Sequence, residues 1–143
     1  MQQILTQYFH SSEAFCQALA ACHRDLTPQN VASLEASQAR YRREAQRLEA
    51  ATLDLHPVEK MGVAALLEAQ MGASQGIVWH NRSRLIRQDA EARLRAGDSD
   101  GAKKLEAEAD ALELQVEGLA DPVFTAQALS EAVGEVLVAE VRP

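Results

Sequence analysis

The stretch from Val63 to Leu94 constrains the fold most, because its apolar residues keep a helical period throughout. It lies in the longest proline-free part of the chain and holds the only tryptophan, Trp79, and the densest basic run. We predict one long helix over residues 57–96, roughly 60 Å in length at the usual rise per residue. Gly72 and Gly76 each cost on the order of 1 kcal/mol relative to alanine, so a break near 72–76 is the alternative to a continuous helix.

Prolines and turn residues divide the rest of the chain into further helices. Pro28, Pro57 and Pro122 each suit the first turn of a helix, where the missing N–H is not needed. Thr27 can cap the helix that Pro28 begins, and residues 97–101 (GDSDG) form a turn. The predicted helices cover residues 3–25, 28–53, 57–96, 99–118 and 122–140.

These helices predict an all-α fold, an antiparallel bundle of four to five helices with a long central third helix. Residues 1–143 form a single helical domain, in which residues 3–53 are one helical hairpin and residues 99–140 are an acidic C-terminal helical hairpin. Aromatic residues make up only 4% of the chain. A core of Leu, Ala and Val between helices is therefore expected.

Apolar positions spaced by three and four predict the buried face of each helix. The first helix has this seam: Leu5, Tyr8, Ser12, Phe15, Leu19, Cys22 and Leu26, widened by Ile4, Phe9, Cys16 and His23. The second has Val31, Leu34, Gln38, Tyr41, Ala45, Leu48 and Thr52. The fourth has Ala102, Leu105, Ala109, Leu112 and Val116.

Charge is distributed unevenly along the chain, whose formal net charge is −7. Residues 81–97 carry five arginines against two acids, whereas residues 98–143 carry three cations against eleven acids. We expect the acidic end to pack beside the basic run; a basic binding stripe is the alternative. The acidic balance argues against a nucleic-acid partner.

Cys16 and Cys22 lie six residues apart within one predicted helix and point to different sides of it. They are poorly placed for a disulfide, which fits a reducing, cytoplasmic location. No apolar run approaches the length of a transmembrane helix, so no membrane span is expected.

Metal and cofactor patterns are incomplete. Asp98 and Asp100 resemble part of a calcium loop, but alanines, Ala96 and Ala107, occupy two positions that must supply ligands. The four histidines form no pair of Glu-x-x-His motifs and no zinc-type Cys/His pair. We therefore expect no cofactor, no metal and no catalytic site, hence a protein that is not an enzyme.

Gly72 and Gly76, four residues apart, leave a smooth strip on one helix face with Ala69 and Ala73. Another backbone can approach such a strip closely. A close helix crossing within the fold is one interpretation, and a docking groove or dimer face is the other.

The segment from Trp79 to Ile86 is a second candidate for partner binding, because Trp and Arg are enriched at binding hot spots. Trp79, Arg82 and Ile86 share one helix face, while Asn81 and Leu85 form an adjacent stripe. The alternative is that Trp79 and Ile86 belong to the core while the arginines are solvated or paired with acids.

The chain resembles the flagellar and type III export chaperones of the FlgN and FliT kind over roughly residues 3–90. The residues that carry the resemblance are Tyr8, Ser12, Phe15, Ala18, Leu34, Glu35, Tyr41 and Leu48 in the hairpin, then Asn81, Arg84, Leu85 and Ile86. The sequence has Ser83 where the family usually has glycine, and its helices after Gly97 are additional. The resemblance implies binding of an amphipathic helix from an export substrate.

Together these features predict a non-enzymatic interaction protein, a cytosolic chaperone or adaptor whose partner is an amphipathic helix. The expected partner-binding residues are Gly72, Gly76, Trp79, Asn81, Arg82, Leu85 and Ile86. One alternative is an oligomeric structural protein whose apolar stripes form a homodimer. Another is a helical enzyme or metal protein with unrecognised ligands.

Overall fold

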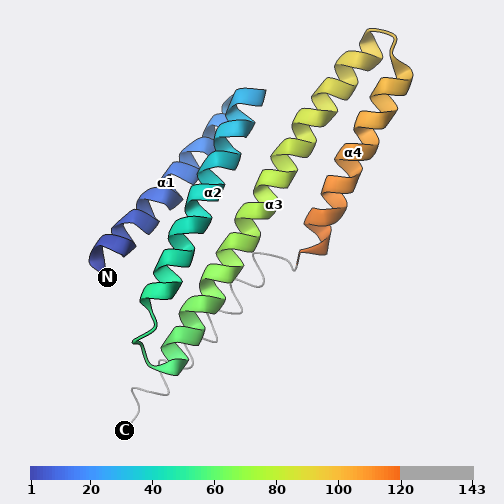
Figure 1. Ribbon diagram of the computed structural model, residues 1–143. Coiled ribbons are helices and arrows are strands. Elements are labelled where there is room, and N and C mark those ends of the chain that lie inside the picture. The colour runs from blue at the N-terminus through green and yellow to red at the C-terminus, as the bar shows by residue number, and fades with distance from the viewer. Residues whose placement is uncertain (120–143) are drawn as a thin grey trace.

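Four helices make up the described part of the chain, residues 1–119 of a computed structural model: α1 (Gln2–Arg24), α2 (Pro28–Ala51), α3 (Pro57–Arg95) and α4 (Ser99–Gly118). They alternate in direction, and α3 is by far the longest (Figure 1). The predicted all-α fold with a long third helix is confirmed. The fifth helix predicted over residues 122–140 lies outside the described residues.

The helix ends follow the local signals in the sequence. The Thr27 hydroxyl accepts a hydrogen bond from the Asn30 N–H at 3.1 Å, as a cap before Pro28 should. Between α3 and α4, Gly97 has a φ of +87°, and the Asp98 N–H donates to the Arg93 carbonyl at 2.9 Å. This is a glycine-based helix end of the Schellman type.

Helix α3 continues without a break through Gly72 and Gly76, so the alternative of a broken helix near 72–76 is wrong. At Gly76, tertiary packing supports the continuous helix. A Cβ built on Gly76 would lie 3.3 Å from a Leu119 methyl and 3.9 Å from a Val116 methyl, so the glycine sits in a tight contact with α4 and the residue after it. Such contacts offset the low helix propensity of glycine.

The core forms where α1 and α2 pair and α3 packs on α2. All seven predicted seam positions of α2 are buried: Val31, Leu34, Gln38, Tyr41, Ala45, Leu48 and Thr52. On α1, Tyr8, Phe15 and Cys22 are buried, but Phe9, Cys16 and His23 are exposed. The predicted widening of the α1 stripe is therefore wrong at these three positions, because α1 packs chiefly on α2 and buries one narrow face.

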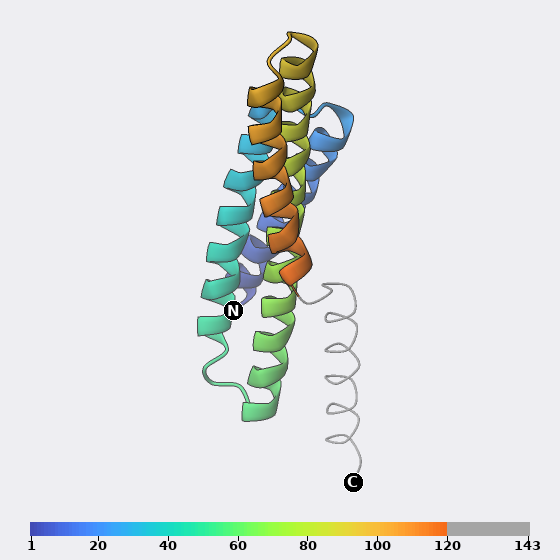
Figure 2. The same ribbon diagram turned by 90° about the vertical axis from the view of Figure 1, so that its right-hand side faces the viewer.

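Helix α4 runs antiparallel along the C-terminal half of α3 only (Figures 1 and 2). The α3 side carries small residues at a spacing of seven: Gly76, Ser83 and Ala90, all buried. The α4 side carries Ala102, Ala109 and Val116 at the same spacing, and the two alanines are buried. The predicted inner face of α4 is thus the one that contacts α3.

Candidate interaction surfaces

A polar junction joins the three helices of the core. The Tyr8 and Tyr41 hydroxyls lie 3.1 Å apart, Tyr41 donates to Gln70 Oε1 at 3.2 Å, and Tyr8 donates to the same oxygen. Burial raises the pKa of Tyr8, and its hydrogen bond with Tyr41 raises it further. Tyr8 therefore stays a protonated donor that ties α1 to α3.

Next to this junction, α1 and α3 enclose an apolar groove of about 420 Å³, which we call the α1–α3 groove. Its lining comprises Met1, Leu5, Tyr8, Phe9, Leu48, Thr52, Leu55, Val63, Leu66, Leu67 and Gln70, without a charged side chain. The floor of the groove is formed by buried side chains of the core, namely Tyr8, Leu48 and Leu67. Its rim is open: Phe9 is 62% exposed and Leu66 38%. Large apolar side chains at the rim of an apolar groove are typical of a binding site.

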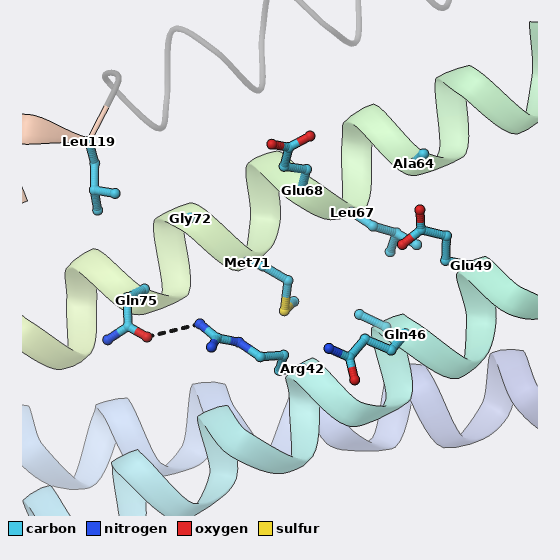
Figure 3. A pocket seen from close by; sticks show the side chains of 11 residues that line it. Arg42, Gln46, Glu49, Ala64, Leu67, Glu68, Met71, Gly72, Gln75 and Leu119 are labelled. Atoms are coloured by element: carbon cyan, nitrogen blue, oxygen red, sulfur yellow. Dashed lines mark hydrogen bonds between the residues drawn. The ribbon is translucent and has the colours of Figure 1, made fainter.

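A second groove of about 480 Å³, the α2–α3 groove, has a mixed lining (Figure 3). Arg42, Glu49 and Glu68 contribute charge, and Arg42 donates to Gln75 Oε1 at 2.9 Å. Gly72 also lines it, with no atom within 4 Å of the position of an added Cβ. Leu119 bounds one end of this groove.

The predicted partner-binding residues are spread over several environments. Gly72 lies in the α2–α3 groove, whereas Gly76 is buried in the contact with α4. Trp79 and Ile86 are half-buried. Gly72, Trp79 and Ile86, spaced by seven, fall on one stripe of α3.

The remaining three predicted residues are engaged within the fold. Leu85 packs against the core, and Arg82 pairs with Glu35 of α2 at 2.7 Å. Asn81 is 2% exposed; its amide donates to the Ile77 carbonyl at 2.8 Å, and its buried Oδ1 has no hydrogen-bond partner among the described residues. Partner binding by these residues stays a prediction.

The predicted pairing of the basic run with the acidic end is found in part. Arg87 pairs with Asp110 at 2.8 Å, and His80 Nδ1 lies 3.0 Å from Glu113 Oε1, which also accepts from the Ser83 hydroxyl. The Ser83 hydrogen bond and the His80 and Arg87 charges lower the pKa of Glu113. Arg82 differs, because its partner is on α2.

Sequence reasoning missed the α1–α3 groove. It assigned Phe9 to the buried stripe, although Phe9 falls beside the Tyr8–Phe15–Cys22 line, whose members are spaced by seven. The signal available in the sequence was a set of large apolar residues after α2 and at the start of α3, of which Leu55, Val63 and Leu66 line the groove.

Within residues 1–119, no three or more His, Cys, Asp or Glu side chains gather where they could hold a metal ion. The Asp98 carboxylate instead accepts from the Gly101 N–H at 2.9 Å as the cap of α4. None of the helices described is long and apolar enough to span a membrane.

Comparison with known proteins adds no relative: the chain matches no protein-family model, no curated protein and no solved structure.

Proposed function

We propose that this protein is a non-enzymatic chaperone or adaptor that binds the apolar face of a partner helix in the α1–α3 groove. The observation that carries the proposal is the groove itself: an uncharged lining over a core floor, with Phe9 and Leu66 open to solvent at its rim. Exposing such residues costs solubility without improving the core, so a bound partner is the natural reason for them.

The shape of the groove favours a helix as the ligand. Its walls are two helices, with lining residues from Met1 to Phe9 on one side and from Val63 to Gln70 on the other. Each wall spans about two helical turns, which suits apolar anchors at i, i+3/4 and i+7 of an amphipathic helix. Because the lining has no charged side chain, we expect few charged residues on the bound face of the partner helix.

An export chaperone is the most specific form of this proposal. It rests on the resemblance of the hairpin and of the Asn81–Ile86 segment to the FlgN and FliT kind. Tyr8 and Leu48, two of the residues that carry the resemblance, line the floor of the groove. A cytosolic location accompanies it, supported by two free cysteines, Cys16 and Cys22.

A pull-down from the native cell with matched variants tests the proposal. Phe9→Ser and Leu66→Ser should each reduce capture of a specific partner at least about tenfold, since hot-spot side chains dominate binding. Leu114→Ser is the control, because Leu114 is 66% exposed on α4 and outside the groove. Circular dichroism should show equal helicity for all three proteins. Equal capture by all three would exclude the groove as the binding site.

The same experiment separates two alternatives. If Trp79→Ala abolishes capture with helicity intact while Phe9→Ser does not, the partner binds the stripe of Gly72, Trp79 and Ile86 instead. If light scattering finds a dimer at low micromolar concentration that Phe9→Ser converts to a monomer, the groove is a homodimer interface.

A further inference from the structure

Three polar side chains interrupt the otherwise apolar lining of the α1–α3 groove: Tyr8, Thr52 and Gln70. Two of them use their hydroxyl protons within the fold. Thr52 donates to the Glu49 carbonyl at 2.6 Å, and Tyr8 donates to Gln70 Oε1. Among the lining side chains, Gln70 is therefore the one that still has hydrogen-bond donors to offer a ligand.

Tyr8 and Tyr41 hold the Gln70 carboxamide in one orientation. Both hydroxyls donate to its Oε1, and both tyrosines are buried, whereas Gln70 is half-buried. The amide oxygen therefore faces the core. The amide nitrogen, Nε2, has no hydrogen-bond partner within residues 1–119, and it is open to solvent, because the buried polar atom without a partner in that range is Asn81 Oδ1.

The Gln70 amide lies at one end of the groove. Helices α1 and α3 run in the same direction, and Tyr8 meets Gln70 (Figure 1). From this pair the lining continues to Met1 on α1 and to Val63 on α3, which is about 10 Å along each helix at the usual rise per residue. A ligand that fills the groove therefore meets apolar walls for about two helical turns and N–H donors at one end.

We propose that Gln70 is a specificity-determining residue of the α1–α3 groove: its amino group donates to an acceptor that the partner helix carries at one end of its apolar face. This role rests on the proposed function above and specifies the chemistry of the partner. The acceptor is a side-chain oxygen of Asn, Gln, Asp or Glu, because the backbone carbonyls within a helix are already engaged. A partner with an apolar side chain at this place would bury the Gln70 donors without an acceptor, which disfavours its binding.

Selection of single-helix peptides from a phage-displayed library tests this, with the full-length chain as the target. Peptides selected on the wild type should share apolar anchors and, at one fixed position a turn or two from them, an Asn, Gln, Asp or Glu. Gln70→Glu keeps an oxygen for both tyrosine hydroxyls and replaces the amino group by a second acceptor, so this variant should select Lys or Arg at that position. Gln70→Leu should select an apolar residue there.

Two matched peptides then measure the size of the effect. One is selected on the wild type, and the other is its copy with leucine in place of the acceptor. Their Kd values should differ at least about tenfold on the wild type and less than about threefold on Gln70→Leu. Gln70→Leu leaves the Tyr8 and Tyr41 hydroxyls 3.1 Å apart, able to pair with each other, and circular dichroism should show wild-type helicity. Leu114→Glu adds a carboxylate on α4, outside the groove, and should select the same peptides as the wild type.

Two outcomes would overturn the role of Gln70 while leaving the groove as the binding site. The wild type and both Gln70 variants could select the same residue at the fixed position, or the wild type could select Lys or Arg there. Failure of the proposed function looks different: Phe9→Ser would select the same peptides as the wild type, or the wild type would select no shared anchors. Either of these results would remove the role of Gln70 as well.

Discussion

The two sides of α3 are packed by different means. Toward the α1–α2 hairpin, the interface uses large side chains, with Leu34, Tyr41 and Leu67 all buried. Toward α4 it uses small ones, such as Gly76, Ser83 and Ala109. The first interface gains mainly from apolar area removed from water. The second interface is stabilised mainly by the close approach of two helices, which favours dispersion contacts, and by a few contacts between charged side chains.

The difference predicts opposite sensitivities to side-chain volume. A site filled by a large side chain should suffer when that side chain is shortened, because a cavity remains. A site that depends on small residues should suffer when a side chain is enlarged, because the helices cannot move apart without losing their contacts.

Truncation on the hairpin side should have the largest effect. Leu34 is 0% exposed, so Leu34→Ala should lower the free energy of unfolding by about 3 kcal/mol, as for other buried leucines. Urea denaturation followed by circular dichroism measures the loss. Leu114→Ala is the control; Leu114 is 66% exposed, and its loss should cost less than about 0.5 kcal/mol. Similar losses for both would mean that Leu34 is not at the centre of the core.

Enlargement on the α4 side should have an intermediate effect. Ala109 is 0% exposed, and Ala109→Leu should cost about 2 kcal/mol through overpacking against α3. Ala107→Leu places the same side chain on an exposed position of the same helix and should be nearly neutral. If the two variants unfold at the same urea concentration, α3 and α4 are not closely packed at Ala109.

Removal of the Glu113 charge should have the smallest effect. Its carboxylate accepts from Ser83 and faces His80 and Arg87, so Glu113→Gln should cost about 1 kcal/mol at neutral pH. Because folding lowers the pKa of Glu113 from its ordinary value of 4.5, its contribution is present above that value and is lost as pH falls through the folded pKa.

Urea denaturation of the wild type and Glu113→Gln across pH 5 to 3, a range below the one in which an imidazole ordinarily gains its charge, checks the direction of this effect. The difference in unfolding free energy should shrink toward acid pH. Glu106→Gln, at an exposed position of α4, should show no comparable trend. A difference that grows on acidification would contradict a carboxylate stabilised in its charged form.

Much of the helix-level organisation is readable from the sequence. The seven seam positions of α2, the Thr27 cap and the turn at Gly97 are recognisable because each depends on neighbours within about four residues. The α1 stripe is less predictable. Phe9 is exposed and Phe15 is buried because α1 packs chiefly on one helix and therefore buries only one narrow face.

The candidate sites are less predictable than the fold. The residue types of the Trp79–Ile86 segment suggest binding, yet Arg82 is held by Glu35 and Asn81 is buried. Arg82 and Glu35 are 47 residues apart in the sequence. The burial of Asn81 depends on which helix lies opposite it. The α1–α3 groove likewise arises from the arrangement of three helices and has no contiguous motif.

Periodicity and capping are local properties of a chain, so they suffice to predict the four described helices, their ends and the amphipathic face of α2. Three other features depend on packing between helices: the close contact at Gly76, the different side-chain sizes in the two interfaces of α3, and the open groove beside Phe9 and Leu66. The physical reason is that burial of a side chain depends on the element packed against it, and several similar helices compete for that place.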